Sequence, residues 1–235
     1  MLWQTVLNLM GTRPKDHCLL EGHAINDYSA MKGSLSIIIQ DVILKYLELF
    51  LCAIFGEYER AAELMADDED DLFHKTGPGL SPVMHDAFVR GLCYFGLARK
   101  TGHAKYKRAG KKILATISNW VKKGNPNVLH YEKLFQAELA ALNGRMSDAD
   151  LYYHKAVGLA TQSGFIQDAA IINERCGDFF QNIQRKSPGY AIHKIEEACR
   201  FYEEWGCSFK AQMLREQYKL NRTSIVSQAT ILVKT

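Results

Sequence analysis

A glycine followed by small and large residues at fixed intervals recurs along the chain and restricts it to packed helices. In LNGRMSDADLYYHKA, residues 142–156, Gly144 is followed by Ala149 after five positions, Tyr153 after nine and Ala156 after twelve. Glycine permits the chain to reverse between two helices, where a Cβ would clash. The small alanine lets the helices approach closely, and the large residue lies on the same helical face. The spacing therefore predicts a helical hairpin.

The same spacing recurs along the chain. GEYERAAELMA (56–66) repeats the glycine, the alanine and the large residue, and GYAIHKIEEA (189–198) repeats the alanine and the two positions after it. A weaker copy has Ala109, Ile113 and Thr116 in these positions. The anchors are Ala61, Ala109, Ala149 and Ala191, at intervals of 48, 40 and 42 residues. A period in this range is typical of stacked helical repeats.

Hydrophobic periodicity predicts four antiparallel helix pairs, with glycine or a breaker-rich turn between the two helices of each pair. The pairs are 37–55 with 57–73, 83–101 with 103–123, 127–143 with 146–163, and 165–184 with 188–205, followed by a short helix at 207–219. One hairpin cannot cover its own apolar face, but stacked hairpins can. We therefore predict an all-α solenoid of about four antiparallel helix hairpins with a concave side.

Residues 142–156 and 191–198 resemble tetratricopeptide (TPR) repeats at the small and aromatic positions of the second helix. The resemblance implies a TPR-like α-solenoid. We divide the chain into a partial N-terminal segment of the repeat region (1–34), a TPR-like helical-repeat domain (35–219), and a polar, β-branched tail or truncated linker (220–235).

A longer resemblance covers most of the chain. LWQTVLNLMG, FGEYERAAEL, WVKKGNPNVLHYEKLFQAELAALNGR, GFIQDAAIINERCGDFF and ACRFYEEWGCSFKAQMLREQY occur in that order. Together they resemble the helical-repeat region of large predicted multidomain signalling ATPases of AAA/STAND type, which are associated with kinase or cyclase modules. The resemblance implies a regulatory arm beside a P-loop domain.

Sequence motifs for catalysis are missing from this chain. It has no G-x-x-x-x-G-K-[ST], and GHAKYKRAGKK (102–112) has the wrong spacing. It has no kinase or nucleophile-elbow motif either. We therefore expect no enzyme activity and no cofactor, and we interpret the chain as a fragment of a signal-transduction ATPase that binds proteins. The alternative is a subunit or truncated copy of an ATP-dependent signalling enzyme whose P-loop domain is missing here. Uncapped repeat ends would favour self-association.

Composition limits the partners and the cellular compartment that we expect. A net charge of +3 is too small to imply a nucleic-acid partner by itself. Six cysteines lie far apart without a C-x-x-C pair, which favours a reducing, cytoplasmic setting. The apolar run 35–55 carries Gln40, Asp41, Lys45 and Glu48, so we expect a buried helix and no membrane partner. His17, Cys18 and His23 fall short of four closely spaced ligands, so no metal is expected.

Two surfaces are candidate binding sites. Repeat proteins bind peptides along the concave side, and counting back from the anchors predicts a groove lined by Tyr46, Phe50, Glu138, Glu174, Asp178 and Gln181. Within NERCGDFF (173–180), the carboxylates of Glu174 and Asp178 could perform acid–base chemistry. We favour the alternative that Glu174 bonds to a neighbouring helix or that Arg175 pairs across the stack. The aromatic residues Phe201, Tyr202, Trp205 and Phe209 are expected in the core.

The second surface is basic and is formed by Lys105, Lys107, Arg108, Lys111 and Lys112. Nine Lys or Arg and no acidic residue lie between residues 99 and 123, whereas 57–71 holds eight acidic residues and one Arg. Two interpretations stay open. The basic stretch binds an acidic partner or nucleic acid, or its helix at 103–123 packs against the acidic second helix of the preceding repeat, 57–71. We favour the second.

Overall fold

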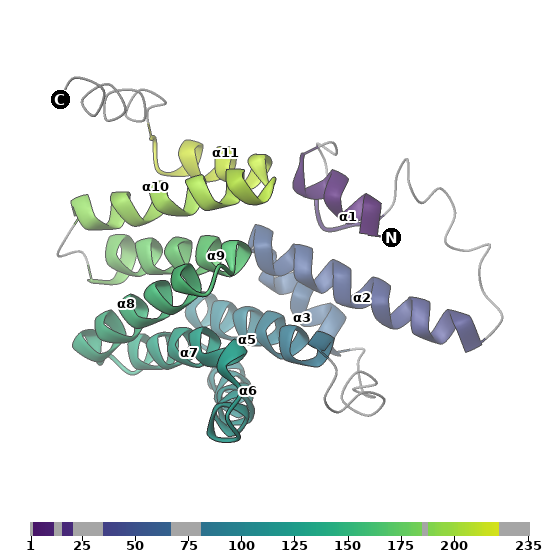
Figure 1. Cartoon of the computed structure of the whole chain (residues 1–235), viewed down its shortest axis with the longest axis horizontal. Coiled ribbons are helices and arrows are strands. Elements are labelled where there is room, and N and C mark those ends of the chain that lie inside the picture. The colour runs from purple at the N-terminus through teal and green to yellow at the C-terminus, as the bar shows by residue number, and fades with distance from the viewer. Residues whose placement is uncertain (1, 12–15, 21–34, 67–80, 185–187, 221–235) are drawn as a thin grey trace.

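The structure is a computed structural model that describes residues 2–11, 16–20, 35–66, 81–184 and 188–220. In this part of the chain all regular secondary structure is helical, as predicted. The helices are, in order, α1 (Leu2–Leu9), α2 (Leu35–Phe55), α3 (Tyr58–Ala66), α5 (Ser81–Thr101), α6 (Ala104–Lys122), the 3₁₀ turn η2 (Pro126–Val128), α7 (Leu129–Leu142), α8 (Met146–Gln162), α9 (Ile166–Asp178), the π-helical turn η3 (Phe179–Gln184), α10 (Pro188–Trp205) and α11 (Ser208–Gln217) (Figure 1).

The helices form the four predicted hairpins. α2 packs against α3, α5 against α6, α7 against α8, and α9 against α10. The predicted boundaries agree within a few residues, except that α3 ends at Ala66 and the rest of the predicted helix lies outside the described residues. Pro126 begins a 3₁₀ turn whose start is held by the Asn125 side chain, which accepts a bond from the Asn127 backbone N–H.

Four helix junctions share one backbone design, which explains the glycine–alanine spacing. Gly144 has a φ of +73°, and the next residue, Arg145, donates its N–H to the Ala140 carbonyl of the helix that ends there. The same Arg145 is the N-cap of α8, and its carbonyl accepts from the Ala149 N–H. One residue thus closes the first helix and opens the second, and the alanine five positions after the glycine lies about one turn into the second helix, where it is buried.

The junction occurs more often than the predicted period. Gly56, Gly164 and Gly206 also have positive φ and are followed five residues later by an alanine with no exposed surface, namely Ala61, Ala169 and Ala211. The junctions at Gly164 and Gly206 connect α8 to α9 and α10 to α11, outside the two helices of a hairpin. The spacing therefore marks a tight turn that occurs both within hairpins and between them, rather than one position in each repeat.

The predicted anchor in α6 was wrong by one residue. Ala109 is only partly buried, whereas Gly110, Leu114 and Ile117 are buried and take the roles predicted for Ala109, Ile113 and Thr116. A Cβ on Gly110 would lie 3.0 Å from the Phe95 ring, so α6 approaches α5 at the residue without a side chain. The weak match at this repeat reflects that shift of register.

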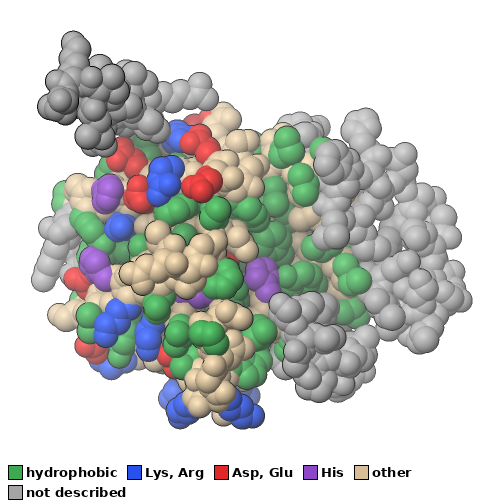
Figure 2. Space-filling view, in the orientation of Figure 1, with side chains coloured by type: hydrophobic (Ala, Val, Ile, Leu, Met, Phe, Trp, Pro, Cys, Tyr) green, Lys and Arg blue, Asp and Glu red, His purple; other side chains and the backbone are tan. Residues whose placement is uncertain are grey.

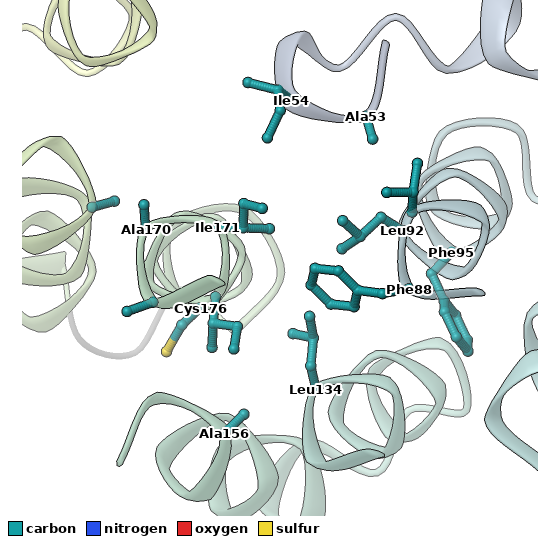
Figure 3. Packing of buried hydrophobic residues seen from close by; sticks show 14 of the residues in the cluster. Ala53, Ile54, Phe88, Leu92, Phe95, Leu134, Ala156, Ala170, Ile171 and Cys176 are labelled. Carbon is teal, nitrogen blue, oxygen red and sulfur yellow. The ribbon is translucent and has the colours of Figure 1, made fainter. Parts of the chain in front are cut away.

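One hydrophobic core lies among the first helices of the hairpins. Figure 3 shows Phe88 and Leu92 of α5 pointing toward Leu134 of α7 and Ile171 of α9, with Ala53 and Ile54 of α2 nearby. Because each of these helices gives its apolar side to the same centre, the core is shared by all four hairpins.

The apolar run of α2 is buried on several sides, as predicted, toward its C-terminal end, whereas Ile43 is 36% exposed. Leu51 and Cys52 have no exposed surface, and Ile54 is 2% exposed. None of the described helices combines the length and the apolar character that crossing a bilayer requires.

The N-terminal and C-terminal parts of the described chain contact one another. The rings of Phe50 in α2 and Trp205 in α10 are 6.0 Å apart. The Phe209 ring of α11 lies 4.3 Å from His17 and 6.0 Å from Phe55. α1 also packs against α11 (Figure 1). Each repeat of an extended solenoid contacts only its neighbours. In this chain the N-terminal helices also contact the C-terminal helices, and we call this contact closure.

Candidate functional site

Three charged side chains from different hairpins meet in the interior. Glu138 of α7 has no exposed surface. Its Oε2 accepts from Arg99 of α5 at 2.6 Å, and its Oε1 accepts from the Arg175 Nε of α9 at 2.5 Å. Tyr153 of α8, also fully buried, accepts from Arg99 at 3.0 Å. This central ion-pair cluster replaces water around a carboxylate that burial alone would destabilise.

The shifted pKa values of Glu138, Arg99 and Arg175 mean that all three groups are charged at neutral pH. Burial raises the pKa of Glu138, but the charges of Arg175 and Arg99 outweigh it and hold that pKa below its usual value. Burial lowers the pKa of Arg99 and of Arg175, whereas Glu138 raises both, with the net result above the usual arginine value. The cluster is therefore a stable set of charges and not a poised acid–base pair.

Further bonds extend the cluster toward the chain ends. Arg175 Nη1 donates to the Tyr58 hydroxyl of α3 at 2.9 Å, and Arg99 Nη1 donates to Asp178 at 2.6 Å. Lys210 of α11 pairs with Glu174 at 2.7 Å. Glu174 also accepts from the Tyr202 hydroxyl, and Asp178 from the Tyr218 hydroxyl. Side chains far apart in the sequence thus fasten α9 to the first hairpin and to α11.

A cavity of about 260 Å³ adjoins these residues. Its wall comes from the α2–α3 junction, the C-terminal ends of α5 and α9, and α11 with the residue after it. The lining residues are Phe55, Gly56, Tyr58, Gly96, Arg99, Lys100, Glu174, Arg175, Asp178, Lys210, Gln217 and Tyr218. The cavity therefore lies where the first hairpin meets the last helix.

The predicted groove residues fall into three places. Glu138, Glu174 and Asp178 belong to the cluster or its extensions, whereas Tyr46 and Phe50 of α2 contact His85. Gln181 lies partly buried in η3. Glu138 is wrong as a peptide contact, because closure of the hairpins buries it completely. The expected bonds of Glu174 and Arg175 to neighbouring helices are confirmed.

Sequence reasoning missed Arg99 and Tyr58 as partners of these residues. Arg99 follows the apolar stretch CYFGLA, where a charged residue is a signal of a buried pair. No comparable signal identifies Tyr58, since its contact with Arg175 spans 117 positions. The expected core positions of Phe201 and Tyr202 are confirmed, while Trp205 and Phe209 are partly exposed.

A second group of largely buried polar pairs lies around the N-terminal half of α5. Tyr46 of α2 bonds to His85 at 2.5 Å, Asp86 pairs with Arg90 at 2.7 Å, and His130 of α7 bonds to Asp168 of α9 at 2.8 Å. Burial lowers the pKa of His85. The Tyr46–His85 bond links α2 to α5 and the His130–Asp168 bond links α7 to α9, which suits a packing role.

The basic surface on α6 is exposed. Lys105, Arg108, Lys111 and Lys112 are exposed and Lys107 is partly buried. Figure 2 shows Lys and Arg side chains at the lower edge of the molecule, where Figure 1 places α6. Among the described residues none of the five forms an ion pair. Lys107 donates to the Leu142 carbonyl at 3.4 Å.

The favoured packing of the acidic helix α3 against the basic helix α6 is not seen in the described residues. α3 packs against α5, and its Glu59 pairs with Lys100 at 2.7 Å. The remaining acidic residues at 67–71 lie outside the described residues. Within the described part, the α6 cations face solvent rather than the acidic helix.

The cysteines and the metal candidates form no reactive site in the described residues. All six cysteines are buried and free. Burial raises the pKa of the Cys176 thiol to about 12, so its thiolate is scarce at neutral pH. His23 lies outside the described residues, and no group of three or more His, Cys, Asp or Glu in the described part is arranged to hold a metal ion.

No protein-family model, curated protein or solved structure matches the chain.

Proposed function

We propose that this chain is a non-catalytic helical scaffold that binds a protein partner. The recurring tight junction is the observation that carries the proposal. The same short glycine–alanine unit sets the turn between consecutive helices at four places, so the helices stack in a regular way. Stacked hairpins of this kind, which we take to be TPR-like, present side chains of several helices on continuous surfaces. The interior charges bond to one another, which supports a structural role for them.

The surface that we assign to the partner is the basic surface on α6. Lys105, Arg108 and Lys112 fall at i, i+3 and i+7 on one helix and span about 10 Å at 1.5 Å per residue. Their charges have no acidic partner among the described residues, so they remain available to an external anion. An acidic protein segment provides matching charges and steers association.

The test measures binding of a fluorescent Glu- and Asp-rich peptide by anisotropy over a series of salt concentrations. The triple variant Lys105→Glu, Arg108→Glu and Lys112→Glu should lose most of the binding. A matched control reverses three exposed charges elsewhere, with Arg145→Glu, Lys155→Glu and Arg200→Glu. The control should keep most of the binding.

Three outcomes contradict the proposal: no peptide binding, equal loss in both variants, or selective binding of a single-stranded RNA in place of the peptide. The last result favours the nucleic-acid alternative, for which RNA affinity should fall steeply with salt.

The resemblance to AAA/STAND ATPases suggests a more specific setting. In that setting the scaffold binds a neighbouring NTPase or kinase domain in the cytoplasm, and partner binding shifts the domain between two states. This remains a prediction from the sequence segments alone.

A further inference from the structure

A short segment without regular secondary structure, residues 16–20, packs along α2. Near one end of the segment the Leu20 N–H donates to Glu48 Oε1 at 3.3 Å. Near the other end the His17 ring lies 5.2 Å from the Phe55 ring. Because the two α2 partners are seven residues apart, they lie on one stripe of the helix. The segment therefore follows this stripe from the C-terminal end of α2 toward its middle.

Two cysteines face one another in the middle of this contact. Cys18 comes between the two anchoring residues of the segment, and Cys52 comes between their partners on the same stripe of α2. The Cys52 thiol donates a hydrogen bond to the Cys18 sulfur. Cys18 is 1% exposed, Cys52 has no exposed surface, and both are free thiols. A pair of thiols in contact is thus enclosed between the segment and the helix.

The same segment contributes to closure. The His17 ring lies 4.3 Å from Phe209 of α11 as well as against Phe55 of α2. Asp16 pairs with Arg60 of α3 at 2.6 Å, but these side chains are 40% and 30% exposed, so solvent screens the pair. A short segment outside any helix opens at a lower free energy than a packed helix does. Lifting of this segment therefore exposes the thiols and also loosens the contact with α11.

We propose that Cys18 and Cys52 form a disulfide with a small-molecule disulfide such as oxidised glutathione as the oxidant, and that this bond locks closure. When the segment lifts, the Cys18 thiolate attacks the oxidant, whose S–S bond breaks, and a mixed disulfide forms as one thiol leaves. The Cys52 thiolate then attacks the Cys18 sulfur, and the second thiol leaves. The two cysteine protons end on the two leaving thiols, so two electrons pass from the pair to the oxidant.

While the segment stays packed, the pair does not react. The hydrogen bond to Cys18 and burial both raise the pKa of Cys52 well above its usual value, so the thiolate is scarce there. The rate of oxidation therefore follows the opening of the segment. Once formed, the bond holds His17 between Phe55 and Phe209. Disulfides in reducing compartments are usually transient and redox-sensing, which suits a switch of this kind. The switch is independent of the basic surface on α6.

Peptide mapping of the oxidised full chain tests the pairing. The chain is incubated with oxidised glutathione at neutral pH, its fold is checked by circular dichroism, and free thiols are blocked before digestion and mass spectrometry. We expect a pair of peptides linked through Cys18 and Cys52. Cys93 of α5 is a third thiol near the pair. A link from either cysteine to Cys93 in place of the expected one, mixed disulfides with glutathione alone, or no disulfide at all overturns the proposal.

Thermal unfolding tests the lock. The two cysteines are 34 positions apart, and a bond across a loop of this length restricts the unfolded chain. Oxidation should therefore raise Tm by several degrees, and dithiothreitol should reverse the rise. Cys18→Ala should abolish this difference between oxidised and reduced protein, whereas Cys199→Ala, which removes another thiol that is 1% exposed, should keep it. No rise in the wild type, or a rise that persists in Cys18→Ala, contradicts the lock.

Discussion

At the scale of single residues, Glu138 shows how burial changes the role of a charge. The sequence alone suggests a polar side chain on a groove, since it lies on the first helix of a hairpin. In the structure it is fully buried and bonds to arginines from two other hairpins. A carboxylate in this position stabilises the fold only while both partners are present.

Replacement of Glu138 should be strongly destabilising. We expect Glu138→Gln to lower the free energy of unfolding by about 3–5 kcal/mol, because two buried arginines lose their counter-charge. Urea unfolding monitored by circular dichroism measures the change. Glu197→Gln is the control, because Glu197 pairs with the exposed Arg200 on the surface and should cost less than about 1 kcal/mol. Equal losses in the two variants would show that the central cluster contributes no more than a surface pair.

The same carboxyl group should make stability depend on pH. Burial raises the pKa of Glu138, but the two arginines lower it by a larger amount, so the pKa in the folded state lies below the usual 4.5. Its contribution is therefore present above about pH 4.5 and is lost as the pH falls through the folded pKa. The difference in unfolding free energy between the wild type and Glu138→Gln should shrink on acidification from pH 6 to pH 3. A difference that is constant over this range is incompatible with a charged Glu138 in the folded state.

At the scale of helices, the junction glycines are predictable and the register of α6 is not. A glycine, its positive φ and an alanine five residues later depend on local backbone geometry, so they leave a sequence signal at Gly56 and Gly144. The buried position in α6 depends on the Phe95 ring of another helix. Local spacing therefore located the helix but not the residue that faces its neighbour.

Two glycines of α8 and its junction should respond oppositely to alanine. Gly144→Ala places a Cβ at a φ of +73° and should cost about 1–2 kcal/mol. Gly158→Ala, inside α8, meets no atom within 4 Å and should stabilise by about 0.5–1 kcal/mol through helix propensity. Thermal unfolding of both variants measures the two effects. A loss of stability in Gly158→Ala, or none in Gly144→Ala, would argue against this geometry.

At the scale of the whole molecule, the decisive feature is closure. Phe209 near the C-terminal end contacts His17 and Phe55 near the other end, and Arg175 bonds to Tyr58 across 117 positions. Such contacts give the end hairpins a second neighbour. Closure also covers part of the apolar ends that would otherwise favour self-association.

Removal of one end contact should therefore be felt at the other end. Phe209→Ala is expected to cost about 1–3 kcal/mol, since this ring is partly exposed. Hydrogen exchange should show lost protection in α1 and the end of α2, far from the substitution in sequence. Leu151→Ala, at a side chain on α8 that is 51% exposed, is the control. It should change neither the free energy of unfolding nor the protection of α1 and α2. Lost protection limited to α10 and α11 would instead indicate an open row of repeats.

The sequence by itself determined the helices, their pairing into hairpins and most junctions, because hydrophobic period and glycine φ are local properties of the backbone. It also indicated that Glu174 and Arg175 bond between helices. Only the tertiary structure decided which hairpins meet, why Glu138 is buried, and where the cavity lies. These depend on side chains such as Arg99, Tyr58 and Lys210, which come together only when the ends of the chain close, and no local pattern encodes a contact across a hundred residues.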